Sequence, residues 1–144
     1  MKLVPVVVVL ASLAGACGGG SNSPTAPSAA PSINVAYSAT DLRAGTGATA
    51  TAGRVASVRY TGWTYSTTAA DNKGTQFDSG TFSFTVGSGV IQGFSMGVTG
   101  MQVGGIRRVV IPPNLGYGNN PPSGQSTIRA NETLLFEIEL LAVQ

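Results

Sequence analysis

The chain has 144 residues, of which 10% are charged, and its formal net charge at pH 7 is +2. So weak a charge provides no electrostatic footprint for nucleic acid. The lack of histidine excludes catalysis by a histidine base or triad. A single cysteine permits neither an intramolecular disulfide nor a zinc site built from several Cys or His ligands. The 20 glycines and 8 prolines favour a fold rich in strands and turns.

Residues 1–16 are predicted to form a signal peptide. Lys2 gives a positive start, residues 3–13 are apolar apart from Ser12, and three small residues precede Cys17. This order is typical of a secretory signal, and the apolar run is shorter than the about 20 residues that span a bilayer. A valine-rich run would also suit a buried strand, but the positive start and the polar stretch that follows favour the signal peptide.

The segment 13–17 (LAGAC) resembles a bacterial lipobox, in which the cysteine is acylated and becomes the first residue of the mature protein. The resemblance implies a lipid at Cys17 that holds the protein on the extracytoplasmic side of the bacterial cell envelope. Gly18 takes the place of the aspartate associated with inner-membrane retention, which favours the outer membrane or outer surface. The alternative is a free cysteine after an ordinary cleavage site.

Residues 18–32 contain no apolar side chain larger than alanine or proline, so they cannot contribute to a core. Together with the lipidated Cys17 they are predicted to form a flexible linker over residues 17–32. Residues 33–144 remain as one globular domain, close to the commonest domain size.

Strand patterns recur along the globular part. In its last segment Phe136 and Ile138 alternate with Glu137 and Glu139, the period-two pattern of a half-buried antiparallel strand. The segments predicted to be strands are, in chain order, 33–37, 54–61, 81–86, 105–111 and 133–143.

One segment has a different period. Ile91, Phe94, Val98 and Met101 recur at intervals of three or four residues, which predicts one short amphipathic helix between residues 89 and 104. The fold class expected is therefore α+β, with an antiparallel sheet packed against a single helix.

Short motifs follow one another at characteristic spacings: YTGW at 60–63, QFDSG at 76–80, FSF at 82–84, GSGVIQGF at 87–94, VGGIRR at 103–108, IPPNLGYG at 111–118 and TLLFEIELL at 133–141. In this order they resemble the FKBP-type peptidyl-prolyl cis-trans isomerases, from about residue 40 to the last residue. The resemblance implies an antiparallel β-sheet half-wrapped around one short α-helix. It also implies an isomerase that needs no cofactor and no metal.

Such a reaction suits the composition. Rotation about an X–Pro bond has a barrier of about 18–20 kcal/mol because amide resonance is lost on the way. No proton transfer or covalent intermediate is required, so a catalyst has only to bind the twisted amide better than the planar one. An apolar pocket does so by holding the proline ring and removing water from the amide carbonyl.

The resemblance also implies a pocket and the role of each residue in it. Phe94 would form the floor under the proline ring, while the Tyr117 hydroxyl and the Ile91 backbone N–H would donate hydrogen bonds to substrate carbonyls. Asp78 would lie at the rim, oriented by Tyr60. The full set is Tyr60, Phe77, Asp78, Phe82, Val90, Ile91, Phe94, Tyr117, Ile128 and Phe136.

Three features depart from the family pattern. Phe94 stands where the family usually has tryptophan, so macrolide immunosuppressants should bind more weakly. Ile128, expected in the loop beside Tyr117, is followed by Arg-Ala rather than Pro-Pro. Residues 64–74 are longer than in the smallest members, which predicts a surface insertion between strands.

Three functions are compatible with this sequence. The first is a monomeric enzyme that isomerises proline-containing polypeptides and so assists folding of exported or envelope proteins. The second is a non-catalytic module or holdase that binds proline-containing segments, and the third is a structural lipoprotein with a vestigial pocket. The loop 118–132 is too short to hold an inserted chaperone domain, which favours the enzyme.

Overall fold

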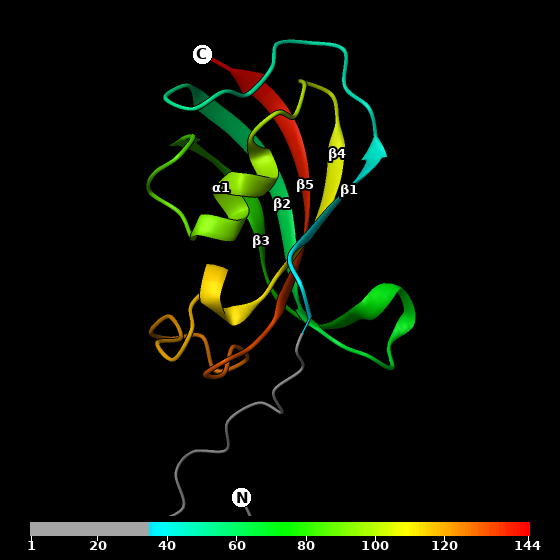
Figure 1. Ribbon diagram of the computed structural model, residues 1–144, viewed down its shortest axis with the longest axis vertical. Coiled ribbons are helices and arrows are strands. Elements are labelled where there is room, and N and C mark those ends of the chain that lie inside the picture. The colour runs from blue at the N-terminus through cyan, green and yellow to red at the C-terminus, as the bar shows by residue number, and fades with distance from the viewer. Residues whose placement is uncertain (1–34) are drawn as a thin grey trace, which may run out of the picture.

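The computed structural model describes residues 35–144 (Figure 1), so the signal peptide, Cys17 and nearly all of the linker predicted above lie outside the described residues. The described part contains five strands and one α-helix, with short 3-10 turns at Ala70–Asn72 and Pro113–Leu115. The elements are β1 (Ser38–Arg43), β2 (Val55–Tyr65), β3 (Lys73–Thr85), α1 (Gln92–Val98), β4 (Ile106–Ile111) and β5 (Leu134–Val143).

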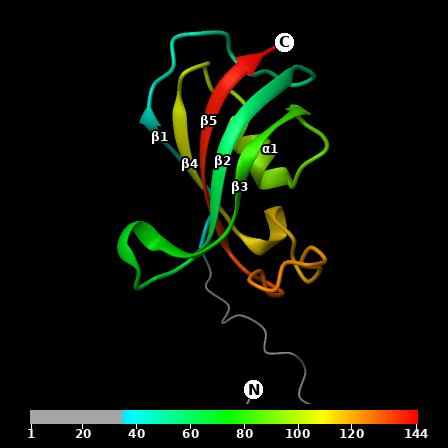
Figure 2. The ribbon, with the colours of Figure 1, turned by 180° about the vertical axis from the view of Figure 1, so that it is seen from behind.

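The strands form one antiparallel sheet in the order β1-β4-β5-β2-β3, which leaves β1 and β3 at its two edges. The helix α1 lies against one face of this sheet, here called the inner face, and the opposite view shows the outer face (Figures 1 and 2). The predicted α+β class, a sheet curled around one short helix, is confirmed.

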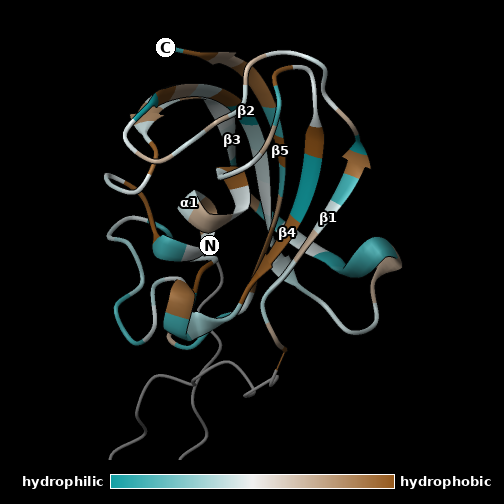
Figure 3. Ribbon diagram, turned by 45° about the horizontal axis from the view of Figure 1, so that its top comes forward, coloured by the Kyte–Doolittle hydropathy of each residue, from teal (hydrophilic) through white to brown (hydrophobic). Residues whose placement is uncertain are grey.

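Alternation along the central strands builds the core on the inner face. Leu134, Phe136, Ile138 and Leu140 of β5 are all at most 4% exposed. In β4 the hydrophilic stretch at Arg107–Arg108 gives way to the buried residues that follow it (Figure 3). The buried residues of β5 therefore share one face, as period-two alternation requires, and from β4 Val109 and Ile111 lie against α1.

Two glycines allow α1 to lie close to β4. A Cβ at Gly93 would stand 2.5 Å from Cγ2 of Ile111, and a Cβ at Gly97 would stand 2.6 Å from Cγ2 of Val109. The helix thus packs with its backbone against β4, and this contact fixes the direction in which Phe94 projects.

The strand boundaries differ from prediction in two places. The predicted strand at 33–37 is wrong, because β1 begins only at Ser38 and residues 35–37 are not in a strand. Every residue of β1 is exposed, so this edge strand shows no burial alternation for a sequence pattern to detect. Of the predicted insertion 64–74, only residues 66–72 lie between strands, because β2 and β3 are longer than predicted and pair out to Tyr65 and Lys73.

Within residues 35–144 no helix has both the length and the hydrophobicity that a membrane-spanning helix requires.

Candidate active site

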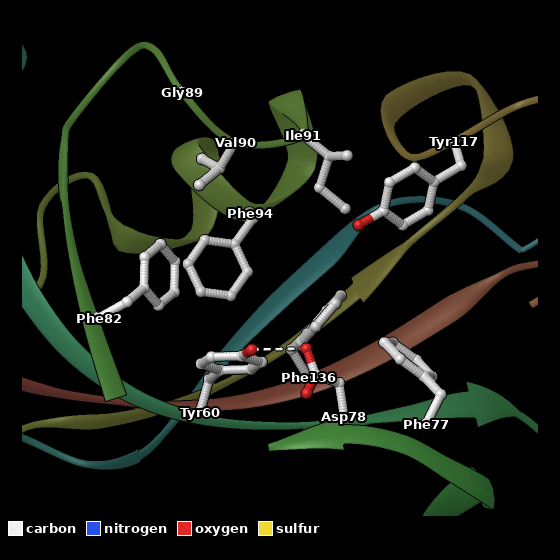
Figure 4. Close-up of a pocket in the computed structure, with 10 residues that line it drawn as sticks. All are labelled: Tyr60, Phe77, Asp78, Phe82, Gly89, Val90, Ile91, Phe94, Tyr117 and Phe136. Atoms are coloured by element: carbon white, nitrogen blue, oxygen red, sulfur yellow. Dashed lines mark hydrogen bonds between the residues drawn. The ribbon is translucent and has the colours of Figure 1, made fainter. Parts of the chain in front are cut away.

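A pocket of about 170 Å³ lies between α1 and the inner face of the sheet (Figure 4). Its lining includes every site residue predicted from the family resemblance except Ile128, and it adds Gly89. The residues are Tyr60 from β2; Phe77, Asp78 and Phe82 from β3; Gly89, Val90, Ile91 and Phe94 from the start of α1 and the loop before it; Tyr117; and Phe136 from β5.

Aromatic rings packed edge to face form the base of the pocket. Phe94, 3% exposed, lies with its ring centroid 5.3 Å from that of Phe136 and 5.9 Å from that of Tyr60, with interplanar angles of 89° and 90°. Phe82 stands 5.8 Å from Phe94 on the other side. Edge-to-face pairs at these distances are favourable beyond the area they bury, so the base is preorganised.

Phe77 and Phe136 meet over a glycine that sequence reasoning did not single out. Their ring centroids are 5.5 Å apart, and a Cβ at Gly62 would stand 2.6 Å from Cζ of Phe77 and 2.8 Å from Cε1 of Phe136. The two rings occupy the space that any side chain at Gly62 would need. Gly62 belongs to the YTGW motif, which was the only signal in the sequence that could have found it.

Tyr60 and Asp78 are tied to each other at the rim. The Tyr60 hydroxyl donates to Oδ2 of Asp78 at 2.6 Å, and the Ser79 N–H donates to Oδ1 at 2.9 Å. Burial, together with this hydrogen bond to a carboxylate, raises the pKa of Tyr60 to about 12. The Asp78 carboxylate is thus held by neighbours on both oxygens, which suits a fixed rim better than a mobile base.

Two hydrogen-bond donors remain available at the mouth. The Tyr117 hydroxyl points towards the pocket (Figure 4), and it makes no hydrogen bond within the described part of the chain. Burial, followed by the charge of Asp78, raises the pKa of Tyr117, so this hydroxyl keeps its proton at neutral pH. The N–H of Ile91, just before α1, likewise has no partner among residues 35–144.

Ile128 does not line the pocket, in contrast to the prediction. It is 3% exposed and belongs to the hydrophobic core cluster. The loop around it turns back on itself, with the Asn131 N–H donating to the Gly118 carbonyl at 2.7 Å. A single apolar residue in a polar loop anchors that loop by burial, and a sequence pattern does not distinguish this role from contact with a ligand.

The arrangement limits the chemistry. Asp78 is the one carboxylic acid in the lining, and within residues 35–144 no three His, Cys, Asp or Glu side chains gather as a metal site would require. The pocket offers dry aromatic surface with two directed donors, which can hold an apolar ring and the carbonyls beside it.

Comparison with known proteins identifies the same family that the sequence motifs resemble. Residues 47–141 match the family described as FKBP-type peptidyl-prolyl cis-trans isomerase. FK506-binding protein 3 of Candida albicans is 43% identical over 109 residues, which cover 72% of this chain but 23% of that one. The FK506-binding protein of Neisseria meningitidis serogroup B is 39% identical, with 72% of this chain and 92% of that one covered.

A solved structure is also similar. The crystal structure of a peptidyl-prolyl cis-trans isomerase from Pseudomonas syringae pv. tomato matches with a TM-score of 0.62 and 33% identity, covering 75% of each chain. The chain spans less than a quarter of the length of the Candida protein but nearly the whole of the Neisseria one. With the family match extending over residues 47–141, the chain belongs to the FKBP-type peptidyl-prolyl cis-trans isomerases.

Proposed function

We propose that the protein catalyses cis-trans isomerisation of X–Pro bonds in exported or envelope polypeptides. The observation that carries this proposal is the pair of unpartnered donors, the Tyr117 hydroxyl and the Ile91 N–H, at the mouth of an aromatic pocket. A pocket built only as core would leave no donor in this position, because buried polar groups are normally paired.

The proposed mechanism follows from the lining. The proline ring rests on Phe94, and the surrounding rings exclude water from the amide carbonyl. Water stabilises the dipolar planar amide more than the twisted one, so its removal lowers the barrier to rotation. The Ile91 N–H and the Tyr117 hydroxyl hold neighbouring carbonyls while the residue before proline turns. No proton moves, and Asp78 serves to fix Tyr60 rather than to act as a base.

The experiment is a protease-coupled isomerisation assay with the purified full chain and a four-residue peptide that contains one X–Pro bond. We expect catalysis that survives exhaustive chelation and dialysis, because the mechanism uses neither metal nor cofactor. Peptide binding without acceleration would instead support a binding module or holdase. Loss of activity on chelation, restored by a divalent ion, would contradict the mechanism.

The names of the relatives suggest a second ligand. Proteins that resemble this chain are called FK506-binding proteins, and we propose that the same pocket takes a macrolide of that kind. Phe94 offers less apolar surface than a tryptophan would, and affinity rises with the apolar area buried. Phe94→Trp should therefore tighten the calorimetric Kd for FK506 by about threefold to tenfold. Equal or weaker binding by the variant would show that residue 94 is not the floor.

A further part of the proposal concerns location. The sequence pattern before Cys17 supports a lipid-anchored monomer on the extracytoplasmic side of a bacterial envelope, in the outer membrane or at the outer surface. Each buried CH₂ of a lipid contributes about 0.8 kcal/mol, and stable anchoring takes more than one acyl chain. Cys17→Ser should move the protein out of the membrane fraction and leave its circular dichroism unchanged. A variant whose signal is cleaved but which stays in the membrane would refute the anchor.

A further inference from the structure

The two edges of the sheet are protected to very different degrees. β1 has six residues, carries Asp41 and Arg43, and has a register irregularity between them. β3 has 13 residues, and its stretch 79–85 (SGTFSFT) contains neither a charge nor a proline. Edge strands are normally kept from pairing with other chains by shortness, charge, proline or a bulge. The last part of β3 uses none of these protections.

Backbone hydrogen bonds show which groups of β3 are directed outwards. Val55 exchanges both of its backbone bonds with Gln144, on the β5 side, so its partner Thr85 forms a non-bonded pair with it. Bonded and non-bonded pairs alternate along an antiparallel ladder. Ser83 and Thr81 therefore also direct their N–H and C=O groups away from β2, and no other described strand lies on that side.

A neighbouring residue independently supports this assignment of bonded and non-bonded pairs between β2 and β3. Ser79 falls in the same alternate set, and its N–H is bonded to Oδ1 of Asp78 rather than to β2. The hydroxyls of Ser57 and Ser83 meet at 2.7 Å, as expected for the closer side chains of a non-bonded pair. Beyond Ser79, then, the edge presents the N–H and C=O groups of Thr81 and Ser83 in the register that an added strand needs.

This open edge adjoins the pocket. Phe82, between Thr81 and Ser83, lines the pocket together with Phe77 and Asp78 of the same strand (Figure 4). An added strand would run about 4.8 Å from β3. A polypeptide whose proline ring is in the pocket therefore lies beside the strand that carries this edge.

We propose that the edge at Thr81–Thr85 is a strand-pairing site for the extended segment that flanks the proline of a substrate. The inference rests on the proposed function, which it deepens by naming the substrate class: non-native polypeptides with a strand-forming stretch beside an X–Pro bond. Side chains of an added strand alternate between the Phe82 face and the hydroxyl-bearing face of Thr81, Ser83 and Thr85. The favoured stretch therefore alternates apolar with small polar residues, and the proline itself lies outside the pairing because it has no N–H to donate.

The experiment compares a four-residue substrate with peptides of about ten residues that carry the same X–Pro bond and a Val-Thr repeat on one side or the other. For the full chain we expect kcat/KM to rise at least about tenfold for one of the two extensions, because two or three backbone hydrogen bonds are gained. N-methylation of alternate amides in that extension should remove the gain, and methylation of the intervening amides should not. This test requires no variant of the protein.

Ser83→Pro supplies the complementary test, because it removes an N–H that faces away from β2 and so leaves the ladder within the sheet intact. The ratio of kcat/KM between long and short peptides should fall to within about twofold of unity. Ser83→Ala is the matched control: it loses the hydroxyl bonded to Ser57 but keeps the N–H, and so should keep the ratio.

The possible failures are distinguishable. Catalysis of the short peptide with no gain from either extension would overturn the inference and leave the proposed function intact. Failure to isomerise the short peptide would overturn the proposed function, and the inference would then stand or fall on the same ratio measured as Kd. A wild-type dimer that Ser83→Pro dissociates, with no gain from either extension, would assign the edge to a second copy and overturn the inference.

Discussion

On the inner face of the sheet Tyr60 and Phe136 project towards α1, whereas on the outer face their neighbours Arg59 and Glu137 project towards solvent. The inner rings pack edge to face around a pocket, and no residue of its lining takes part in an ion pair with any described residue. The outer face instead carries a network of charges beside the buried side chains of Val110 and Leu135. One pair of strands thus carries two environments of opposite chemistry.

The charges of the outer face are shared among several partners. Glu137 lies 2.8 Å from Nζ of Lys73 and 3.0 Å from a guanidinium nitrogen of Arg108. Glu139 is bonded in the same way by Arg43 at 3.0 Å and by Arg59 at 3.3 Å. Such exposed or partly exposed pairs contribute little each, so the whole network adds only a small gain in stability.

The difference shows how this chain keeps its pocket and its network of charges apart, on opposite faces of the same strands. Rotation of an X–Pro bond requires dry surface, and the one carboxylate of the lining, Asp78, is held at the rim by the Tyr60 hydroxyl and the Ser79 N–H. Period-two alternation places charged side chains on the opposite face of the same strands. Substitutions on the inner face should therefore change activity, and those on the outer face should change stability alone.

The largest effect is expected from Phe136→Ala, which removes a pocket wall and admits water to the amide. We expect kcat/KM to fall at least about a hundredfold, and the free energy of unfolding to fall by about 3–5 kcal/mol because a buried ring is lost. Rates should be compared at a temperature at which circular dichroism shows the variant folded. Glu139→Gln, on the other face of β5, is the control and should remain within about twofold of the parent. A folded Phe136→Ala variant with the parent rate would place the proline pocket elsewhere.

A pair of glycines sharpens the comparison within the inner face. Gly62→Ala drives a methyl group into the rings of Phe77 and Phe136, at 2.6 and 2.8 Å. Overpacking of this kind costs about 1–3 kcal/mol of stability, and displacement of two lining rings should lower kcat/KM by about tenfold or more.

Gly80→Ala is the matched control on the next strand. A Cβ there would stand 3.8 Å from the Tyr60 ring, an ordinary contact, so both activity and stability should stay close to those of the parent. Urea titrations and the isomerisation assay measure both variants. Equal effects of the two substitutions would show that the packing at Gly62 is unimportant.

Much of this architecture could be predicted from the sequence, because the buried strands repeat apolar residues with period two. The segment 133–143 is the clearest case, and β5 follows it nearly residue for residue. The pocket was predicted only through the ordered motifs of the family, since Phe82 and Phe84 look alike in a pattern although only Phe82 lines the pocket.

The start of β1, the role of Gly62 and the contacts of Arg107 had no signal in the neighbouring sequence. The exposed strand β1 has no buried face to repeat, so its start, predicted at residue 33, was misplaced by five residues. Gly62 acts through the side chain that it lacks. The Arg107 side chain joins Asp41 at 2.6 Å to the Gly97 carbonyl at the end of α1, a contact across 66 residues that no spacing rule predicts.

A smaller effect is expected from Tyr117→Phe, which removes one donor and keeps the ring. A net hydrogen bond contributes about 0.5–1.5 kcal/mol, so kcat/KM should fall by no more than about tenfold. A loss larger than that of Phe136→Ala would show that one polar group, rather than pocket shape, dominates catalysis.

The same hydroxyl gives a pH prediction. The pKa of Tyr117 is raised by burial and that of Tyr60 is raised to about 12, so both keep their protons well above neutral pH. With no histidine in the chain, kcat/KM should be constant from about pH 6 to about pH 9. A bell-shaped profile within this range would indicate an acid–base step that the mechanism lacks.

The smallest effect is expected on the outer face, from Glu137→Gln. Burial alone would raise the pKa of Glu137, but hydrogen bonds from Lys73 and Arg108 outweigh it and hold the pKa below its usual 4.5. A carboxyl whose pKa is lowered by folding stabilises the fold above its unfolded pKa, and this contribution is lost as the pH falls through the folded pKa.

At about pH 7 the variant should therefore be about 1 kcal/mol less stable than the parent. In urea titrations this difference in the free energy of unfolding between parent and variant should narrow steadily below about pH 4.5. At neutral pH the kcat/KM of the variant should stay within about twofold of the parent value. A stability difference that stays constant down to about pH 3 would show that the Glu137 charge is not what stabilises this face. A large loss of activity would contradict the separation of the two faces.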